Sequence, residues 1–329
     1  MTEHFYHIGQ RTGKAPVIKK CGAVCRGMEQ TPVVWNNELY LVESREPDVI
    51  CPVQYIRVRS EKTGAVTAPF GENCYFASAF AEDGVLYVFA TSRFDDKPLT
   101  MYQSEDAAAW HDPRGGHTVR MFYSSDLVEW KSCDILHCPD KRLWNTSVCR
   151  GDDGYRMAIE ASANPGEENK NSAVGQPFTS FFARSSDLFH WEMLPDAYAY
   201  TPNRYNACPA LRYTDGFYYM ICLEALPCQR YAPYIYRTKN FLDWEVGFHN
   251  PIMMYGDDDR RVKPGCTLSP EDLDLLETGL NINCSDLDLC EFEGKTRIYY
   301  ANGDQMTYSF LCEAEYDGPL SDFLKAFFC

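Results

Sequence analysis

A short pattern that occurs three times along this 329-residue chain constrains its fold more than any other feature. The three copies are Ser124-Ser-Asp-Leu-Val-Glu-Trp130, Ser185-Ser-Asp-Leu-Phe-His-Trp191 and Thr238-Lys-Asn-Phe-Leu-Asp-Trp244, and an alternating aromatic run precedes each. The Asp or Asn and its polar neighbours favour a turn, and the Trp then begins the returning strand. Each copy therefore predicts a β-hairpin.

A second pattern, a polar or Gly-containing turn followed by an aromatic-rich strand, occurs five times, beginning at Trp35, Glu82, Asp152, Thr214 and Phe292. Asp-Gly and Asn-Asn between apolar runs are strong hairpin signals. A further hairpin follows at least three of the five. This arrangement predicts an all-β fold, a five-bladed β-propeller with short peripheral helices. A β-sandwich of unrelated hairpins is the alternative, and the repeated Asp-Leu-x-x-Trp argues against it.

The spacing of the hairpins predicts one propeller domain over residues 1–329. Its blades are expected near 29–70, 71–139, 140–201, 202–250 and 284–318. Residues 1–28 are expected to supply a closing strand or lid. Short helices are predicted after Ser269, a favoured N-cap residue, and within 319–329.

Composition excludes several classes of protein. The 31 Lys and Arg residues against 47 Asp and Glu residues give a net charge of −16, which disfavours nucleic-acid and membrane-surface binding. No apolar run of about 18 residues predicts a membrane span, and the first residues do not resemble a signal peptide. The 15 cysteines are therefore expected to be reduced, buried thiols in a cytoplasmic protein.

In a four-stranded blade, the start of the first strand and the end of the second lie on the same face of the propeller. The sequence places a ring of polar residues at these positions. Glu160 and Glu224 are the most informative, because each ends a strongly apolar strand where a carboxylate is costly without a purpose or a partner. Desolvation there is expected to raise the carboxyl pKa, as an acid catalyst needs. A structural ion pair with Arg is the alternative.

From about residue 29 to 318, the repeated patterns resemble the five-bladed propeller glycoside hydrolases of families 43, 32 and 117 and their relatives. The Ser-x-Asp-Leu-x-x-Trp hairpins and the short Asp-Gly-x-Tyr-Tyr strands are the similar features. The segment 285–300 also resembles uncharacterised bacterial members of this group. The resemblance implies a glycosidase with a carbohydrate substrate, and it favours an inverting mechanism.

In the enzymes that the chain resembles, a carboxylate on the first inner strand acts as base or nucleophile. A second, on blade three, orients the substrate, and a Glu on blade four is the general acid. Glu29 matches the first position, with Glu where Asp is usual. Asn145 stands at the start of the inner strand of blade three, and Asn206 and Cys208 stand at the start of that of blade four, where the other two carboxylates are expected. Glu160 and Glu224 are expected to substitute for them from adjacent strand ends.

Glycoside hydrolysis needs one protonated and one ionised carboxyl group beside the glycosidic bond. The hypothesis makes Glu29 the base and Glu224 or Glu160 the acid, with rim aromatic side chains stacking on the sugar. The expected substrate is a small oligosaccharide or glycoside. The candidate substrate-binding residues are Arg45, Glu72, Asn73, Arg93, His111, Asn145, Asn206, Asp286 and Gln305.

Three other functions stay open. A non-catalytic carbohydrate-binding propeller would use the carboxylates only to accept hydroxyl hydrogen bonds. A metal-dependent hydrolase would use His111 and His117, although no cofactor or metal is favoured. A glycoside phosphorylase would need a basic pocket, for which the candidates are Arg45, Arg93, Arg114 and Arg150. Homo-oligomerisation also stays open.

Overall fold

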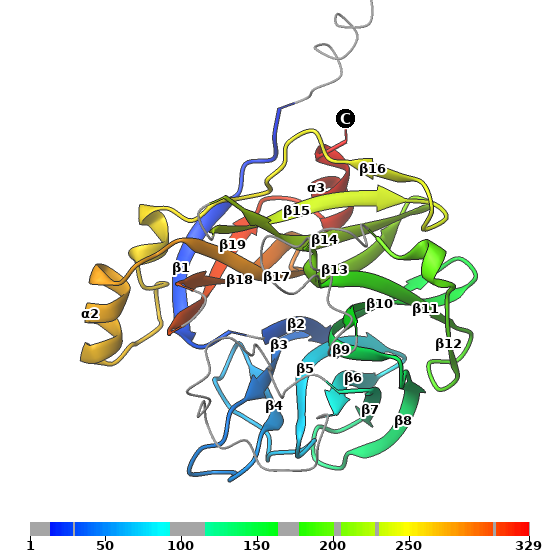
Figure 1. The fold of residues 1–329 in the computed structure, drawn as a ribbon. Helices are drawn as coiled ribbons and strands as arrows, with labels where there is room; N and C mark the ends of the chain where they lie inside the picture. The colour runs from blue at the N-terminus through cyan, green and yellow to red at the C-terminus, as the bar shows by residue number, and fades with distance from the viewer. Residues whose placement is uncertain are drawn as a thin grey trace, which may run out of the picture. The chain divides into compact units, whose positions relative to one another are not determined.

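The computed structural model describes residues 14–28, 30–92, 116–163, 178–200, 205–227, 230–304 and 307–328. Within these ranges the chain is mostly β-strand, with two α-helices and two 3-10 helices (Figure 1). The predicted all-β class is confirmed. Contacts divide the chain into two compact units, Glu29–Arg212 and Met1–Met28 with Tyr213–Cys329.

Three antiparallel sheets form the unit Glu29–Arg212, and in each sheet consecutive strands of the chain pair. The first sheet has three strands, and after its last strand the chain returns through the isolated bridges Arg59↔Val66 and Ile56↔Phe70. The strands of the first sheet are β2 (Gln30–Trp35), β3 (Glu38–Arg45) and β4 (Tyr55–Ser60). Those of the second are β5 (Cys74–Glu82), β6 (Val85–Ser92), β7 (Thr118–Ser124) and β8 (Lys131–His137). Those of the third are β9 (Lys141–Gly151), β10 (Gly154–Ala163), β11 (Thr179–Ser185) and β12 (Trp191–Met193).

Two apolar clusters join these sheets face to face. Val42 and Val58 of the first sheet pack in one cluster with Val88 of the second. Phe89 of the second sheet packs in another with Ile159 of the third. Burial of these faces is the main force that holds the three sheets together.

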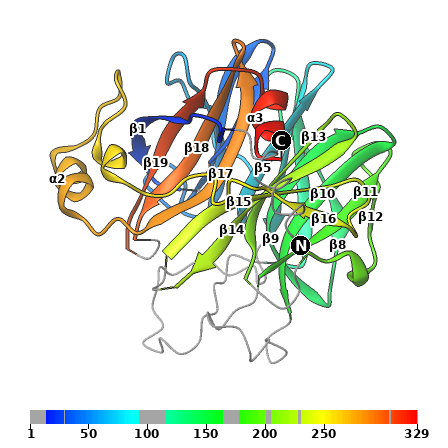
Figure 2. The same cartoon turned by 90° about the horizontal axis from the view of Figure 1, so that it is seen from above.

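One sheet with the order β1-β19-β18-β17-β15-β14 dominates the other unit, and β16 pairs with β15. The first strand of the chain, β1 (blue), lies beside the last, β19 (red), in both views (Figures 1 and 2). A single parallel bridge, Tyr231↔Asn283, joins β15 to β17. β13 (Ala207–Thr214) leads along the chain from one unit to the other. The remaining bounds are β1 (Lys19–Arg26), β14 (Phe217–Leu226), β15 (Arg230–Thr238), β16 (Trp244–Val246), β17 (Asn283–Phe292), β18 (Lys295–Gly303) and β19 (Ser309–Tyr316).

The structure has helices at both predicted places. α2 (Pro270–Thr278) begins after Ser269, whose hydroxyl accepts a hydrogen bond from the Asp272 N–H at 3.1 Å. α3 (Leu320–Ala326) follows Pro319. The two 3-10 helices are η1 (Asp196–Tyr198) and η2 (Asp257–Arg260). None of the helices in the described ranges is long and apolar enough to cross a membrane.

The turn residues explain why the hairpins form where the sequence predicts them. Both central residues have positive φ in four of the first-type turns: 49° and 62° at Asn36 and Asn37, with the same pattern at 83–84, 215–216 and 293–294. Type I′ turns require this conformation, and Asn and Gly adopt it at low cost. In the second type, the Asp126 carboxylate accepts hydrogen bonds from the N–H groups of Val128 and Glu129, both at 2.9 Å. The copies at 185–191 and 238–244 repeat these bonds.

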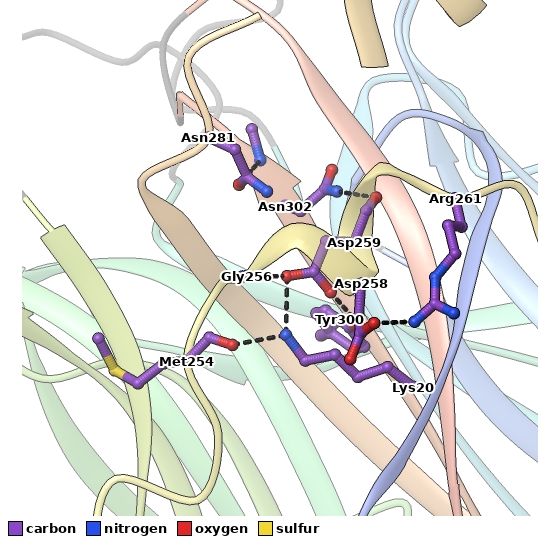
Figure 3. A network of polar contacts seen from close by, with 10 residues as sticks. Lys20, Met254, Gly256, Asp258, Asp259, Arg261, Asn281, Tyr300 and Asn302 are labelled. Carbon is purple, nitrogen blue, oxygen red and sulfur yellow. Dashed lines mark hydrogen bonds and ion pairs between the residues drawn. The ribbon is translucent and has the colours of Figure 1, made fainter. Parts of the chain in front are cut away.

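A buried polar network ties β1 to a segment more than 230 residues later in the chain (Figure 3). The Lys20 ammonium donates to Asp259 Oδ2 at 2.7 Å and to the Met254 carbonyl at 2.6 Å. The Gly256 N–H also donates to Asp259 Oδ2, at 2.7 Å, and the Tyr300 hydroxyl donates to Oδ1 at 2.6 Å. Burial raises the pKa of Tyr300 well above its usual range, so its O–H remains a donor.

The same segment pairs with β1 through its backbone. The Ala23 N–H donates to the Arg261 carbonyl at 2.7 Å, and the Lys263 N–H donates to the Ala23 carbonyl at 2.8 Å. Gly22 permits this approach, because its φ is +108° and a Cβ there would lie 2.4 Å from the Arg261 oxygen. The N-terminal strand is therefore fixed on one side by β19 and on the other by residues 261–263.

Candidate functional site

Four of the predicted site residues, Glu29, Arg93, His111 and Gln305, lie outside the residues that the structure describes. The other eight divide between the two units. Glu160, Asn145, Asn206, Arg45, Glu72 and Asn73 belong to the unit Glu29–Arg212, and Glu224 and Asp286 belong to the other.

Glu160 lies near the end of β10 and is only 4% exposed. Its Oε2 accepts a hydrogen bond from the backbone N–H of Cys208 at 2.7 Å and another from Asn145 Nδ2 at 3.1 Å. Asn145 Nδ2 also lies 3.4 Å from Cys208 Sγ. Two residues from different strands, Asn145 and Cys208, therefore meet at the Glu160 carboxylate.

A β-bulge in β9 lies opposite Glu160. The register of β9 with β10 shifts between Ile159 and Ala161, and both of these residues pack into the same apolar cluster. Two residues of β9, Trp144 and Asn145, lie opposite the single residue Glu160, so the extra residue is on β9. Bulges of this kind redirect a side chain and are frequent next to functional sites.

A second backbone feature, a residue with positive φ, recurs near the starts of β5, β13 and β17. Cys208, in β13, has a φ of +49°, a conformation in which a side chain costs energy. Phe76 in β5 and Asp286 in β17 have φ values of +54° and +50° at equivalent places, each at a shift of strand register. In β13, this conformation accompanies the N–H that binds Glu160.

Asn206 lies immediately before β13 and is fully buried. Its N–H donates to the Phe178 carbonyl at 2.8 Å, and its Oδ1 accepts from the Ser180 hydroxyl at 2.7 Å. Within the described part of the chain, its Nδ2 has no hydrogen-bond partner. Ser180 pairs in register with Glu160, so Asn206 belongs to the same polar group.

A row of aromatic rings runs beside these polar side chains. Ring centroids are 5.5 Å apart for Phe76 and Trp144, 5.1 Å for Trp144 and Phe178, and 5.7 Å for Phe178 and Tyr205. All three contacts are edge-to-face, which is a favourable arrangement for aromatic pairs. Trp144 and Phe76 are buried, whereas Phe178 and Tyr205 are partly exposed. The outer end of the row therefore offers apolar ring surface next to Asn206.

Glu224 and Asp286 have separate surroundings in the other unit. Glu224 is buried near the end of β14, and its Oε1 accepts a hydrogen bond from the Tyr236 hydroxyl. The Asp286 carboxylate accepts from the Ser285 hydroxyl, which in turn accepts from Asn283 Nδ2 at 2.7 Å. Each carboxylate thus has a hydroxyl donor from its own unit.

Asn73 is held by Gln54, a buried residue that the sequence did not single out. The Asn73 N–H donates to the Gln54 carbonyl at 2.9 Å. Arg45 lies at the end of β3, 4.0 Å from Asp48. Glu72 is exposed in the turn that precedes β5.

Two residues considered for other functions are held elsewhere. Arg150, a phosphate candidate, pairs with Glu82 and lies opposite Tyr155 in the sheet. Tyr155 is five residues before Glu160 on β10, about 16 Å at the usual rise of a strand. His117 uses Nδ1 to donate to the backbone carbonyl of Lys141 at 2.6 Å.

No group of His, Cys, Asp or Glu in the described ranges is arranged to hold a metal ion. Every cysteine that the structure describes is a free thiol, and about half of them are buried. Burial raises the pKa of Cys74 to about 11 and that of Cys149 to about 12.

Sequence reasoning missed the partners of the two buried carboxylates. Cys208 donates to Glu160 through its backbone N–H, and the type of residue in the sequence does not indicate a backbone contact. Tyr236 lies in an alternating aromatic run, where nothing distinguishes the ring that reaches Glu224. Phe178, by contrast, comes just before the alternating aromatic run that precedes Ser185, a signal for a ring near a strand end.

No protein-family model matches the chain, and no curated protein matches it. Solved structures do match. The chain is similar to the family 43 glycoside hydrolase BlXynB from Bacillus licheniformis, with a TM-score of 0.53 and 14% identity over 90% of this chain. It is similar to the family 32 β-fructofuranosidase BmSUC1 from Bombyx mori, with a TM-score of 0.53 and 13% identity over 92% of this chain. The chain spans 54% and 61% of the lengths of these two proteins.

A third similar structure is the β-1,2-mannobiose phosphorylase from Listeria innocua, in complex with β-1,2-mannobiose. Its TM-score is 0.54 and its identity 11%, with 94% of this chain and 93% of the phosphorylase covered. At these identities the similarity establishes the fold. It is the fold of the glycoside hydrolases of families 43 and 32 and of related phosphorylases, as the sequence patterns predict.

Proposed function

We propose that this protein is a glycoside hydrolase that acts on a small oligosaccharide or glycoside. Glu160 is one of its working carboxylates, and Glu29 and Glu224 are the candidates for the second. The proposal also takes the strand groups β2–β4, β5–β8, β9–β12, β13–β16 and β17–β19 with β1 as five blades. A cytoplasmic location remains a prediction from the sequence.

The position of Glu160 is the observation that carries this proposal. Asn145 and Cys208 stand where the resemblance expects carboxylates, and Glu160 is hydrogen-bonded to both residues. The Glu160 carboxylate, from β10, thus contacts both of the residues that stand where carboxylates are expected. A buried ionisable group with specific polar partners is a candidate for a functional site, so this placement supports a chemical role for Glu160.

The chemistry needs a second carboxyl group on the other side of the glycosidic bond. A separation of about 5–5.5 Å between the two would give retention of configuration, and about 6.5–9.5 Å would leave room for a water and give inversion. The resemblance favours inversion. A crystal structure with a bound monosaccharide, from which the Glu29–Glu160 and Glu160–Glu224 separations are measured, decides between these outcomes.

The aromatic row and Asn206 suit a sugar. The flat apolar face of a pyranose or furanose ring packs well on an aromatic ring, and Phe178 and Tyr205 are the partly exposed members of the row. The buried Asn206 Nδ2 is a donor that a sugar oxygen could accept from. Polar groups with fixed directions beside apolar surface are typical of small-molecule sites.

A glycoside phosphorylase is the second candidate, because the similar phosphorylase from Listeria innocua covers nearly the full length of this chain. Incubation of the protein with a panel of aryl glycosides and disaccharides, with and without inorganic phosphate, separates the two candidates. A hydrolase releases free sugar at the same rate in both conditions. A phosphorylase releases sugar phosphate and depends on phosphate. If no glycoside in the panel is cleaved in either condition, both candidates are wrong, and a sugar that binds without turnover would indicate a carbohydrate-binding protein.

A further inference from the structure

We infer that Glu160 works as an ionised carboxylate, and that Asn145 is the positioning residue that keeps it so, together with the backbone N–H of Cys208. The position of Asn145 in the sequence predicts a sugar ligand. The inference gives it the positioning role instead. This inference rests on the proposed function for its catalytic meaning, but the charge state of Glu160 can be measured without any substrate.

The two groups that bind Glu160 Oε2 can only donate. A backbone N–H has no lone pair to offer, and neither has the amide nitrogen of Asn145. Their donors lie 2.7 Å and 3.1 Å from the same oxygen, so a negative charge on that oxygen strengthens both bonds. Hydrogen bonds made to the charged form of a carboxyl group favour that form.

The charges on the surrounding strands act in the same direction. Glu160 is the only acidic residue of β9, β10, β11 and β13, all of which lie within the described ranges. No neighbouring carboxylate on these strands therefore opposes its ionisation. The titratable side chains of these strands, apart from Glu160, are Lys141, Arg142, Cys149, Arg150, Tyr155, Arg156, Arg184, Cys208, Arg212 and Tyr213.

The surroundings of Glu224 differ in kind. One of its partners is the Tyr236 hydroxyl, which can donate to a carboxylate or accept from a protonated carboxyl group. Such a partner tolerates either charge state, whereas the two N–H donors of Glu160 do not. The inference therefore removes Glu160 from the candidates for general acid and makes it the base, or the charged group that stabilises the transition state.

The test replaces Asn145 and follows the protonation of Glu160 directly. Asn145→Leu removes one donor at similar volume, and Asn145→Asp places a second carboxyl group beside Oε2. Infrared difference spectra between each protein and its Glu160→Gln derivative, recorded over a pH titration, isolate the carboxyl signal of Glu160. Asn281→Leu, which removes a buried Asn from the other unit, is the matched control for general destabilisation.

In the wild type we expect Glu160 to be ionised at neutral pH. Asn145→Leu should raise the titration midpoint by about one pH unit, since a hydrogen bond to a charged group is worth at least that much. Asn145→Asp should raise it further, and Asn281→Leu should not move it. Where turnover is measurable, the apparent pKa of the acidic limb in the pH profile of kcat/KM should rise by the same amount, because the base must be ionised. A protonated Glu160 at pH 7 in the wild type, or a midpoint that both Asn145 variants leave unchanged, overturns the inference. Absence of turnover with the expected infrared shifts overturns only the proposed function.

Discussion

Asp259→Asn is expected to loosen the N-terminal strand of the protein. The substitution keeps the shape of the side chain but removes the charge of the fully buried Asp259 from the network in Figure 3. Lys20 then has no carboxylate partner, while its contact with the Met254 carbonyl, at 2.6 Å, is retained. The contacts between β1 and residues 254–263 should weaken first.

The size of the effect follows from the burial of the pair. Removing one partner of a buried ion pair costs about 3–5 kcal/mol. Asp259 is fully buried, but the Lys20 side chain is 14% exposed, and part of its charge can be solvated once the carboxylate is lost. The cost should therefore lie at the low end, at about 3 kcal/mol, or roughly a 150-fold change in an equilibrium constant.

Hydrogen exchange measured peptide by peptide is the suitable assay. Five of the six tryptophans lie within Glu29–Arg212 and only Trp244 lies in the other unit, so total fluorescence would report mainly on the wrong unit. Protection should fall by about two orders of magnitude in peptides that cover β1, residues 254–263 and β18. Asp272→Asn is the matched control, because Asp272 pairs with Arg26, whose side chain is 42% exposed. Such a pair contributes about 0–1 kcal/mol. If Asp259→Asn lowers protection no more than Asp272→Asn does, the network does not hold the strand.

Three further substitutions test other parts of the structure. Gly22→Ala should destabilise β1 by more than about 1 kcal/mol, because its φ is +108° and the added methyl meets a backbone oxygen at 2.4 Å; urea unfolding followed by circular dichroism measures this. The hydrogen bond from His190 lowers the pKa of Asp187 to about 2. The ionised Asp187 therefore stabilises the folded protein above the ordinary pKa of 3.8, and this stabilisation is lost as the pH falls towards 2. For Asp187→Asn, the free energy of unfolding measured between pH 2 and 5 should not show this loss. A wild-type protein with the same flat pH profile would contradict the prediction. Phe178→Ala should raise KM for a cleaved glycoside about tenfold with little change in kcat, because a stacking platform binds substrate and transition state alike. An unchanged KM would remove Phe178 from the substrate site.

The hairpins and the two helices could be predicted because their signals are local. A two-residue turn such as Asn36-Asn37 contains the positive-φ preference that its conformation needs, and Ser269 caps the helix that it precedes. The same holds for the turn at Asp126, whose side chain bonds to backbone groups two and three residues ahead. Interactions of this range are visible in any short window of the sequence.

The partners of buried charges could not be predicted, because they come from distant parts of the chain. Asp257-Asp258-Asp259 looks like a solvated acidic turn, yet Asp259 is fully buried against Lys20, which is 239 residues away. Asp258, its neighbour, instead pairs with Arg261 in an exposed bridge. Only the packing of β1 on this segment distinguishes the two.

The surroundings of Glu160 show the same limit at the candidate site. An isolated Glu at the end of an apolar strand indicated that this residue was unusual. The bulge at Trp144 and Asn145 of β9, and the left-handed conformation of Cys208, determine which groups it meets. Neither the bulge nor this conformation has a signature in the sequence. The sequence therefore predicts a sugar ligand at Asn145 and does not indicate that the amide of Asn145 contacts Glu160.

The most direct test of the proposed function is the turnover of Glu160→Gln on whichever glycoside the wild-type protein cleaves. Glu192→Gln is the matched control, since Glu192 lies in the same sheet but is exposed and paired with Arg184. If Glu160 is a working carboxylate, its variant should lose about 10²-fold or more in kcat/KM, while Glu192→Gln keeps the wild-type value. Wild-type activity in Glu160→Gln would show that the chemistry lies elsewhere.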